Sequence, residues 1–223
     1  MPRLPRSFYT RPAQTVARDL LGCTLVRILP DGTRLAGIIV ETEAYVGVKD
    51  SGCHSHQGRR TPKNEAMYMQ GGTFYVYFTY GMHFCCNVVC GKPDEPIAVL
   101  IRALEPVEGT ETMLSHRRIP APKTPGRNIC DGPGKLCQAL AISKPENGVD
   151  LVTSDYLWIE PRPTIGKLKV TTGPRIGLST ETVWKDKLLR FGLANHSCLS
   201  KPFPSKLPKS AKPRGSKSKP SKH

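Results

Sequence analysis

The stretch TFYVYFTYGMHFCCNVV, residues 73–89, decides the expected fold, because it begins as a β-strand with hydroxyl groups along one side. Successive residues of a strand point to opposite faces. One face would therefore carry Thr73, Tyr75, Tyr77 and Thr79. The other face would carry Phe74, Val76, Phe78 and Tyr80. Tyrosine is common in strands, so the rings fit an ordinary sheet, but they would also suit a flat ligand.

Positive charge is concentrated towards the C-terminal end of the chain. The 223 residues include 33 Lys/Arg and 18 Asp/Glu, a formal charge of +15. Residues 201–223 hold eight Lys/Arg, five Pro, five Ser and no acidic residue. Such a segment cannot bury enough apolar surface to fold, so we expect a disordered tail. The other 25 basic and 18 acidic residues leave +7 on residues 1–200, the expected single domain. This surplus favours nucleic acid as partner over a membrane surface.

No segment of the sequence indicates secretion or membrane insertion. It contains no run of 18 apolar residues, and its first residues lack the apolar core of a signal peptide. We therefore expect the eight cysteines to be thiols in a reducing compartment. Zinc is not indicated, since Cys85, Cys86 and Cys90 form no C-x-x-C pair and Cys53-His54-Ser55-His56 stands alone.

The remaining elements are mainly short strands. Asp31-Gly32 between two apolar runs predicts a β-hairpin. Further strands are expected at 97–106, 156–161, 167–178 and 188–193. Helical segments are expected near 12–21, 64–69, 107–118 and 131–143. Strands dominate without regular β-α-β alternation, which favours an α+β fold with a mostly antiparallel sheet.

The second strand of this hairpin, within residues 34–47, carries two carboxylates. Alternation would place one set of side chains together on one face: Leu35, Gly37, Ile39, Glu41, Glu43 and Tyr45. A carboxylate in a covered, aromatic place is a candidate general base. Spacing leaves Glu41 and Glu43 equally open, and a solvated carboxylate at a strand end is the ordinary alternative.

Other polar residues stand in apolar or aromatic surroundings. His54 or His56 would lie near the tyrosine face, where stacked rings can hold a base. Asn87 could read a base edge, because an amide both donates and accepts. In the strand 97–106, alternation puts Leu100, Arg102 and Leu104 on one face. Asn87 and Arg102 could equally be structural.

Four motifs together carry a family resemblance. GIIVETEAYVG, FYVYFTYGMHFCCNVV, VLIRALEP and DGPGKLCQALAI resemble, in order and spacing, the alkyladenine (3-methyladenine) DNA glycosylases. The resemblance runs from about residue 11 to 142, and more weakly to about 200. It implies a monofunctional DNA repair enzyme that flips alkylated or deaminated purines out of double-stranded DNA and hydrolyses the N-glycosidic bond, with no metal or cofactor.

The resemblance also implies roles for individual residues. Glu43 would activate the attacking water, and Arg102 would support the water site. Tyr45, His54 and Tyr77 would hold the flipped base, and Asn87 would exclude the amino group of normal guanine. Tyr80, at the tip of a hairpin, would fill the gap in the duplex. The DNA-contacting tip would also include Met82 and His83. His83 stands where relatives are expected to have a tyrosine, so groove contacts would differ.

The fold implied by the resemblance is a curved sheet similar to the C-terminal domain of formyltransferases. We expect a monomer in the nucleus, since the tail is rich in lysine. The alternatives are a non-catalytic nucleic-acid-binding module and an RNA-binding appendage with this fold. Either could use the basic charge and the tyrosines, but neither needs Glu43 together with the other site residues.

Overall fold

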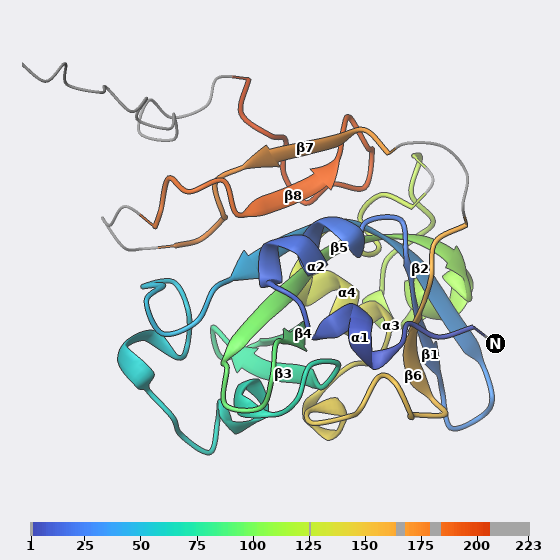
Figure 1. The fold of residues 1–223 in the computed structure, drawn as a ribbon. Helices are drawn as coiled ribbons and strands as arrows, with labels where there is room; N and C mark the ends of the chain where they lie inside the picture. The colour runs from blue at the N-terminus through green and yellow to red at the C-terminus, as the bar shows by residue number, and fades with distance from the viewer. Residues whose placement is uncertain (1, 125, 164–167, 179–183, 206–223) are drawn as a thin grey trace, which may run out of the picture.

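One antiparallel sheet with short helices packed against it organises the chain (Figure 1). The computed structural model describes residues 2–124, 126–163, 168–178 and 184–205. In chain order the strands are β1 (Thr24–Ile28), β2 (Arg34–Tyr45), β3 (Phe74–Thr79), β4 (His83–Cys90), β5 (Ile97–Glu108), β6 (Leu157–Glu160), β7 (Val170–Gly173) and β8 (Arg190–Leu193). The helices are α1 (Arg6–Tyr9), α2 (Ala13–Asp19), α3 (Thr110–Arg117) and α4 (Pro133–Ala139), with 3-10 turns η1 (His56–Gly58), η2 (Glu65–Tyr68) and η3 (Lys144–Glu146). The α+β prediction is confirmed.

The long strand β2 is the centre of the sheet. The order of the strands is β3-β4-β5-β2-β1-β6, and β8 pairs with both β2 and β7. The first half of β2 pairs with β1, as the Asp31-Gly32 hairpin predicts, and the second half pairs with β8. Figure 1 shows β7 and β8 beyond β2, on the side away from β3. The second half of β2 therefore lies between β5 and β8.

A β-bulge in β2 separates its apolar half from its acidic half. Ile39 pairs with Leu104 and Glu41 pairs with Ala103, so Val40 is an extra residue on β2. Because the side-chain period of a strand is two, one extra residue moves the following side chains to the other face. Ile39 and Leu104 accordingly belong to the main core against α2 and α4, whereas Val40 and Ala103 pack on the opposite face.

A second bulge lies opposite, in β5. Thr42 pairs with Ile101, so Arg102 is the extra residue. The Thr42 hydroxyl donates to the carbonyl of Ala17 in α2 at 2.8 Å, which places Thr42 on the helix-covered face. Its neighbour Glu43 and the bulged Arg102 therefore share the other face.

Simple alternation was wrong at both bulges. It grouped Leu35 and Ile39 with Glu41, and it grouped Leu104 with Arg102. Leu35, Ile39 and Leu104 face the main core, whereas Glu41 and Arg102 face the opposite side. Leu100 does share a face with Arg102, since both line the same cavity. Alternation failed because it assumes that every residue of one strand has a partner on the next.

The C-terminal segment continues to contact the sheet beyond residue 200. The Arg190 guanidinium donates to the Pro202 carbonyl at 3.0 Å and lies 3.8 Å from the centre of the Phe203 ring. Gly173 and Gly192 leave room for this ring, since a Cβ at Gly192 would meet it at 2.7 Å. Of the predicted disordered tail, residues 206–223 lie outside the described residues.

Within the described ranges, no helix is long and apolar enough to cross a membrane. The same residues contain no group of three His, Cys, Asp or Glu side chains that could hold a metal ion. All eight cysteines are buried and free.

Candidate active site

A cavity of about 340 Å³, which we call the aromatic pocket, opens beside the ends of β2, β3 and β5. Its lining includes six of the residues predicted from the sequence: Tyr45, His54, Tyr77, Tyr80, Asn87 and Arg102. They come from strands and loops that are distant in the sequence. The structure therefore brings most of the predicted site together.

Aromatic rings form one side of the aromatic pocket. Tyr75 and Tyr77 lie next to each other on β3, with ring centres 5.5 Å apart, as alternation predicts. The His54 ring stands edge-on to Tyr77, with centres 4.5 Å apart, and its Nδ1 lies 2.8 Å from the Tyr75 hydroxyl. Burial, together with the charge of Arg59, lowers the pKa of His54 below its ordinary value. This aromatic side of the pocket is thus uncharged and suited to the face of a flat ring.

Glu43 lies directly behind this lining and is fully buried. Its Oε1 accepts the backbone N–H of Ile176 at 2.7 Å and lies 3.2 Å from Arg102 Nη1. Its Oε2 accepts the hydroxyl of Tyr45 at 3.0 Å. Ile176, Arg102 and Tyr45 all line the aromatic pocket. The carboxylate is therefore fixed from three directions at the edge of the cavity.

Tyr45 and Arg102 are both protonated, and each can therefore donate to the Glu43 carboxylate. Burial, and then the charge of Glu43, raises the pKa of Tyr45 well above its ordinary value, so its hydroxyl remains a donor. Burial opposes the charge on Arg102, but Glu43 and Glu41 outweigh this and raise the pKa of its guanidinium. Arg102 is therefore a permanent cation between two carboxylates.

Glu41 has a different environment, although it is equally buried. It accepts from the backbone N–H of Ser200 at 2.6 Å and from the Ser200 hydroxyl at 2.9 Å. It also lies 3.2 Å from Arg102 Nε and 3.4 Å from Arg190 Nη1. Neither Ser200 nor Arg190 is among the lining residues of the aromatic pocket. Of the two carboxylates that spacing left open, only Glu43 has all its partners on the pocket wall.

Asn87 lies on β4 opposite Tyr75, with which it is paired across the strands. Its side-chain amide donates to the Tyr75 carbonyl at 3.1 Å, and the residue is buried. This bond fixes the amide group on the wall of the aromatic pocket.

The hairpin between β3 and β4 projects Tyr80 into solvent. Tyr80 and Gly81 have φ angles of +52° and +67°, and Met82 N–H donates to the Thr79 carbonyl at 3.2 Å. Two successive positive φ angles are typical of a type I′ turn, where a bulky residue is unusual. Tyr80 is 80% exposed and Met82 69%. His83 is also exposed, and its ring lies beside Gly134 of α4, where an added Cβ would lie 3.0 Å from the ring.

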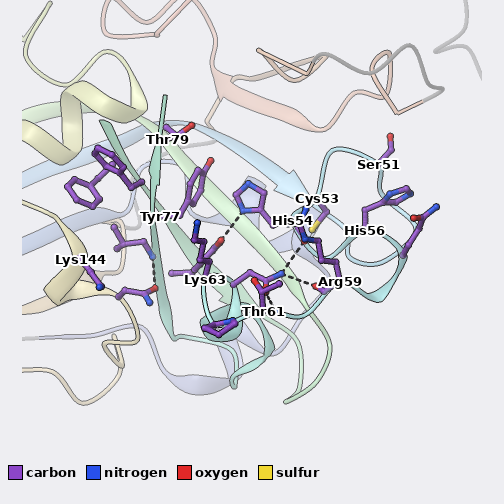
Figure 2. A pocket seen from close by; sticks show the side chains of 18 residues that line it. Ser51, Cys53, His54, His56, Arg59, Thr61, Lys63, Tyr77, Thr79 and Lys144 are labelled. Carbon is purple, nitrogen blue, oxygen red and sulfur yellow. Dashed lines mark hydrogen bonds between the residues drawn. The ribbon is translucent and has the colours of Figure 1, made fainter. Parts of the chain in front are cut away.

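A larger cavity of about 920 Å³, which we call the outer cavity, shares His54, Tyr75 and Tyr77 with the aromatic pocket. Figure 2 shows Arg59 and Lys63 on the loop after His54, with Lys144 on the other side. Sequence reasoning did not select these residues. It also missed Asp50, Arg175 and Ile176, for which no local pattern gives a signal.

The fold and the site together define an α+β domain with a pocket for a flat ring beside a buried carboxylate. The chain matches the family model of methylpurine-DNA glycosylase (MPG) over residues 7–197, and it belongs to this family. The predicted family is thus confirmed.

Named relatives include DNA-3-methyladenine glycosylases of mammals. The mouse protein is 47% identical over 196 residues, which cover 85% of this chain and 58% of that protein. The human protein is 45% identical over 195 residues, covering 85% and 65%. A putative 3-methyladenine DNA glycosylase of Methanocella arvoryzae is 47% identical over 205 residues, covering 92% and 98%. The chain therefore spans less than two thirds of the mammalian proteins but nearly all of the archaeal one.

Proposed function

We propose that this protein is a DNA repair glycosylase that releases alkylated or deaminated purines from duplex DNA and leaves an abasic site. The observation that carries the proposal is the Glu43 carboxylate, held by three residues that line the aromatic pocket. A non-catalytic binding module would not need a buried carboxylate at this place, since burying a charge is costly.

The damaged base enters the aromatic pocket after rotation out of the duplex. Tyr45, His54 and Tyr77 contact its faces and edges, and stacking on such rings contributes about 1–3 kcal/mol per base. Asn87, fixed by Tyr75, excludes the exocyclic amino group of normal guanine. Tyr80 fills the gap left in the base stack, which offsets part of the few kcal/mol that unstacking costs. Its exposure and its fixed turn support this role.

Bond cleavage requires a leaving group, a nucleophile and stabilisation of the sugar cation. N-alkylation makes the purine cationic and therefore a better leaving group. Glu43 accepts a proton from water as it attacks the anomeric carbon, and its charge stabilises the oxocarbenium-like sugar. Arg102 holds the carboxylate and supports the water site. The electrons of the broken bond leave with the base, so a cationic alkylated purine departs as a neutral base. A neutral purine such as hypoxanthine must also take up a proton to depart as a neutral base. No enzyme–DNA covalent intermediate forms.

Duplex DNA is the expected partner, and the distribution of basic residues supports this. Arg59, Lys63 and Lys144 surround the outer cavity, next to the rings of the aromatic pocket. These side chains are placed to contact the phosphates beside the flipped nucleotide. We propose that the protein acts as a monomer in the nucleus, the latter from its lysine-rich tail.

Single-turnover excision tests the proposal. Duplexes carrying 3-methyladenine, 7-methylguanine, ethenoadenine or hypoxanthine are incubated with excess protein, and abasic sites are then cleaved with alkali. We expect release of at least one of these bases by the native protein and none from undamaged DNA. Lesion binding without release from any duplex would refute the proposal in favour of a binding module.

A further inference from the structure

Asp50 and Arg175 form a buried ion pair at the edge of the aromatic pocket. Arg175 Nη1 lies 2.6 Å from Asp50 Oδ2, and Nη2 lies 2.7 Å from Oδ1, so the pair is bidentate. Both side chains are 0% exposed. Arg175 also donates to the Ala44 carbonyl at 3.1 Å, and its guanidinium lies 4.6 Å from the ring centre of Tyr45. The pair thus joins two loops to the end of β2.

The segment after Arg175 reaches the Glu43 carboxylate. The next residue, Ile176, donates its backbone N–H to Glu43 Oε1 at 2.7 Å, the shortest of the three contacts to this carboxylate. Ile176, Gly177 and Leu178 line the pocket. The position of Arg175 therefore determines where this amide meets the carboxylate.

The loop that carries Asp50 forms the facing wall. Gly52 and His54, two and four residues further on, both line the pocket. A Cβ at Gly52 would lie 2.8 Å from Leu178 Cδ2 and 3.0 Å from Arg175 Nη2. The two walls thus touch where residue 52 has no side chain, and the ion pair lies directly behind this contact.

We propose that Asp50 and Arg175 are positioning residues that set the orientation of the Glu43 carboxylate and the width of the base pocket. This inference rests on the proposed glycosylase function. Neither residue touches the reacting atoms; Arg175 acts through the Ile176 amide, and Asp50 acts through Arg175. A bidentate guanidinium–carboxylate pair suits this task, because its planar fork fixes direction as well as distance.

A structural role and a positioning role of the Asp50–Arg175 pair predict different outcomes when the pair is removed. Loss of a structural pair lowers the melting temperature and leaves the chemical step of the folded protein unchanged. Loss of a positioning pair also slows base release, since a misplacement of about 1 Å can cost about 10²-fold in rate. It also alters the contact of the Ile176 N–H with the Glu43 carboxylate, which shifts the acidic limb of the pH–rate profile.

The pH readout depends on every group that faces this carboxylate. Among the residues that the structure describes, the charged and titratable neighbours of Glu43 are Glu41, Tyr45, Tyr77, Cys85, Arg102, Arg175 and Arg190. The variants Asp50→Asn and Arg175→Lys leave the others in place. Arg175→Lys retains the charge but loses the planar fork, so it separates orientation from charge.

The matched control is Glu146→Gln. Glu146 Oε1 lies 2.8 Å from Arg27 Nη2 in another buried pair, which joins η3 to β1, and neither residue is among the lining of the aromatic pocket. For each variant, the melting temperature, the affinity for lesion duplex and the single-turnover rate from about pH 5 to 9 are measured. We expect Asp50→Asn and Arg175→Lys to release base about 10- to 100-fold more slowly with a shifted acidic limb, and Glu146→Gln to change stability alone.

Native rates and an unchanged acidic limb in folded Asp50→Asn or Arg175→Lys would overturn the inference. If Asp50→Asn does not fold, Arg175→Lys carries the test, because it keeps a cation opposite Asp50. Failure of the native protein to release any base would instead refute the proposed function, and the positioning roles with it.

Discussion

Replacement of Glu43 by glutamine tests the centre of the proposed mechanism. The change keeps the size of the side chain and removes its charge. In the native protein the Ile176 nitrogen lies 2.7 Å from Glu43 Oε1, and the Gln oxygen can still accept this N–H. The Tyr45 hydroxyl can rotate to accept from the new amide. Arg102 loses one carboxylate at 3.2 Å but keeps Glu41 at 3.2 Å. We therefore expect a folded protein that is destabilised by about 1.5–3 kcal/mol, the contribution of a charged hydrogen bond.

The effect on base release should be larger than the effect on stability. General base catalysis contributes about 10²–10⁴-fold, or about 2.7–5.4 kcal/mol at 1.36 kcal/mol per factor of ten. The lost charge also no longer stabilises the positive sugar. A decrease of at least about 10³-fold in the single-turnover rate is expected, while lesion affinity stays nearly unchanged because the pocket walls are intact.

Glu41→Gln provides the control for this prediction. Glu41 is as buried as Glu43 and shares Arg102, but its remaining partners are Ser200 and Arg190. Its replacement should lower stability and slow excision much less than Glu43→Gln does. Excision by Glu43→Gln within about tenfold of the native rate, or a greater loss in Glu41→Gln, would refute the choice of Glu43 as the base.

Three further predictions concern the rest of the molecule. Tyr80→Ala should weaken lesion binding and leave the melting temperature nearly unchanged, because Tyr80 is 80% exposed; an unfolded variant would show that the ring supports the hairpin instead. Deleting residues 206–223, which hold seven Lys/Arg, should reduce the salt dependence of DNA binding by up to about 0.9 for each phosphate that the tail neutralises, and an unchanged slope would exclude binding of the tail to DNA. Burial lowers the pKa of His54 from 6.5, so the unfolded chain binds a proton there that the folded chain does not. The stability of the native protein should therefore fall as the pH decreases below about 6.5. Between about pH 7.5 and 5.5, the melting temperature of His54→Gln should decrease less than that of the native protein. Equal decreases would contradict a neutral His54 in the folded protein.

Strand alternation and turn residues predict the sheet well where the ladder is regular. The Asp31-Gly32 turn joins β1 to β2, and Tyr75 and Tyr77 share a face of β3, both as expected. Alternation holds here because each residue of β1 and β3 pairs with one residue of the neighbouring strand, so the period of two is uninterrupted.

The same reasoning failed at the two bulges, for a physical reason. An extra residue at Val40 or Arg102 depends on the pairing with the opposite strand, and neither residue type marks a bulge in the sequence. Asp50 and Arg175 were missed for a related reason. They are 125 positions apart in the sequence, so no local period links them, and only the fold brings them together.

The bulges also explain how charged residues can occupy the centre of this sheet. Glu41, Glu43, Arg102 and Arg190 are all buried, with two charges of each sign. Desolvation of such ions costs several kcal/mol each, and only close pairing offsets it, so a core selected for stability alone would be apolar here. Glu41 follows the extra residue Val40 in β2, and Arg102 is itself the extra residue in β5. For this reason both side chains reach the face opposite the helices, where they form an ion pair. Arg102 then contacts both carboxylates and leaves Glu43 at the pocket wall. Under the proposed function, this cost in stability is the requirement for holding the Glu43 carboxylate beside the base pocket.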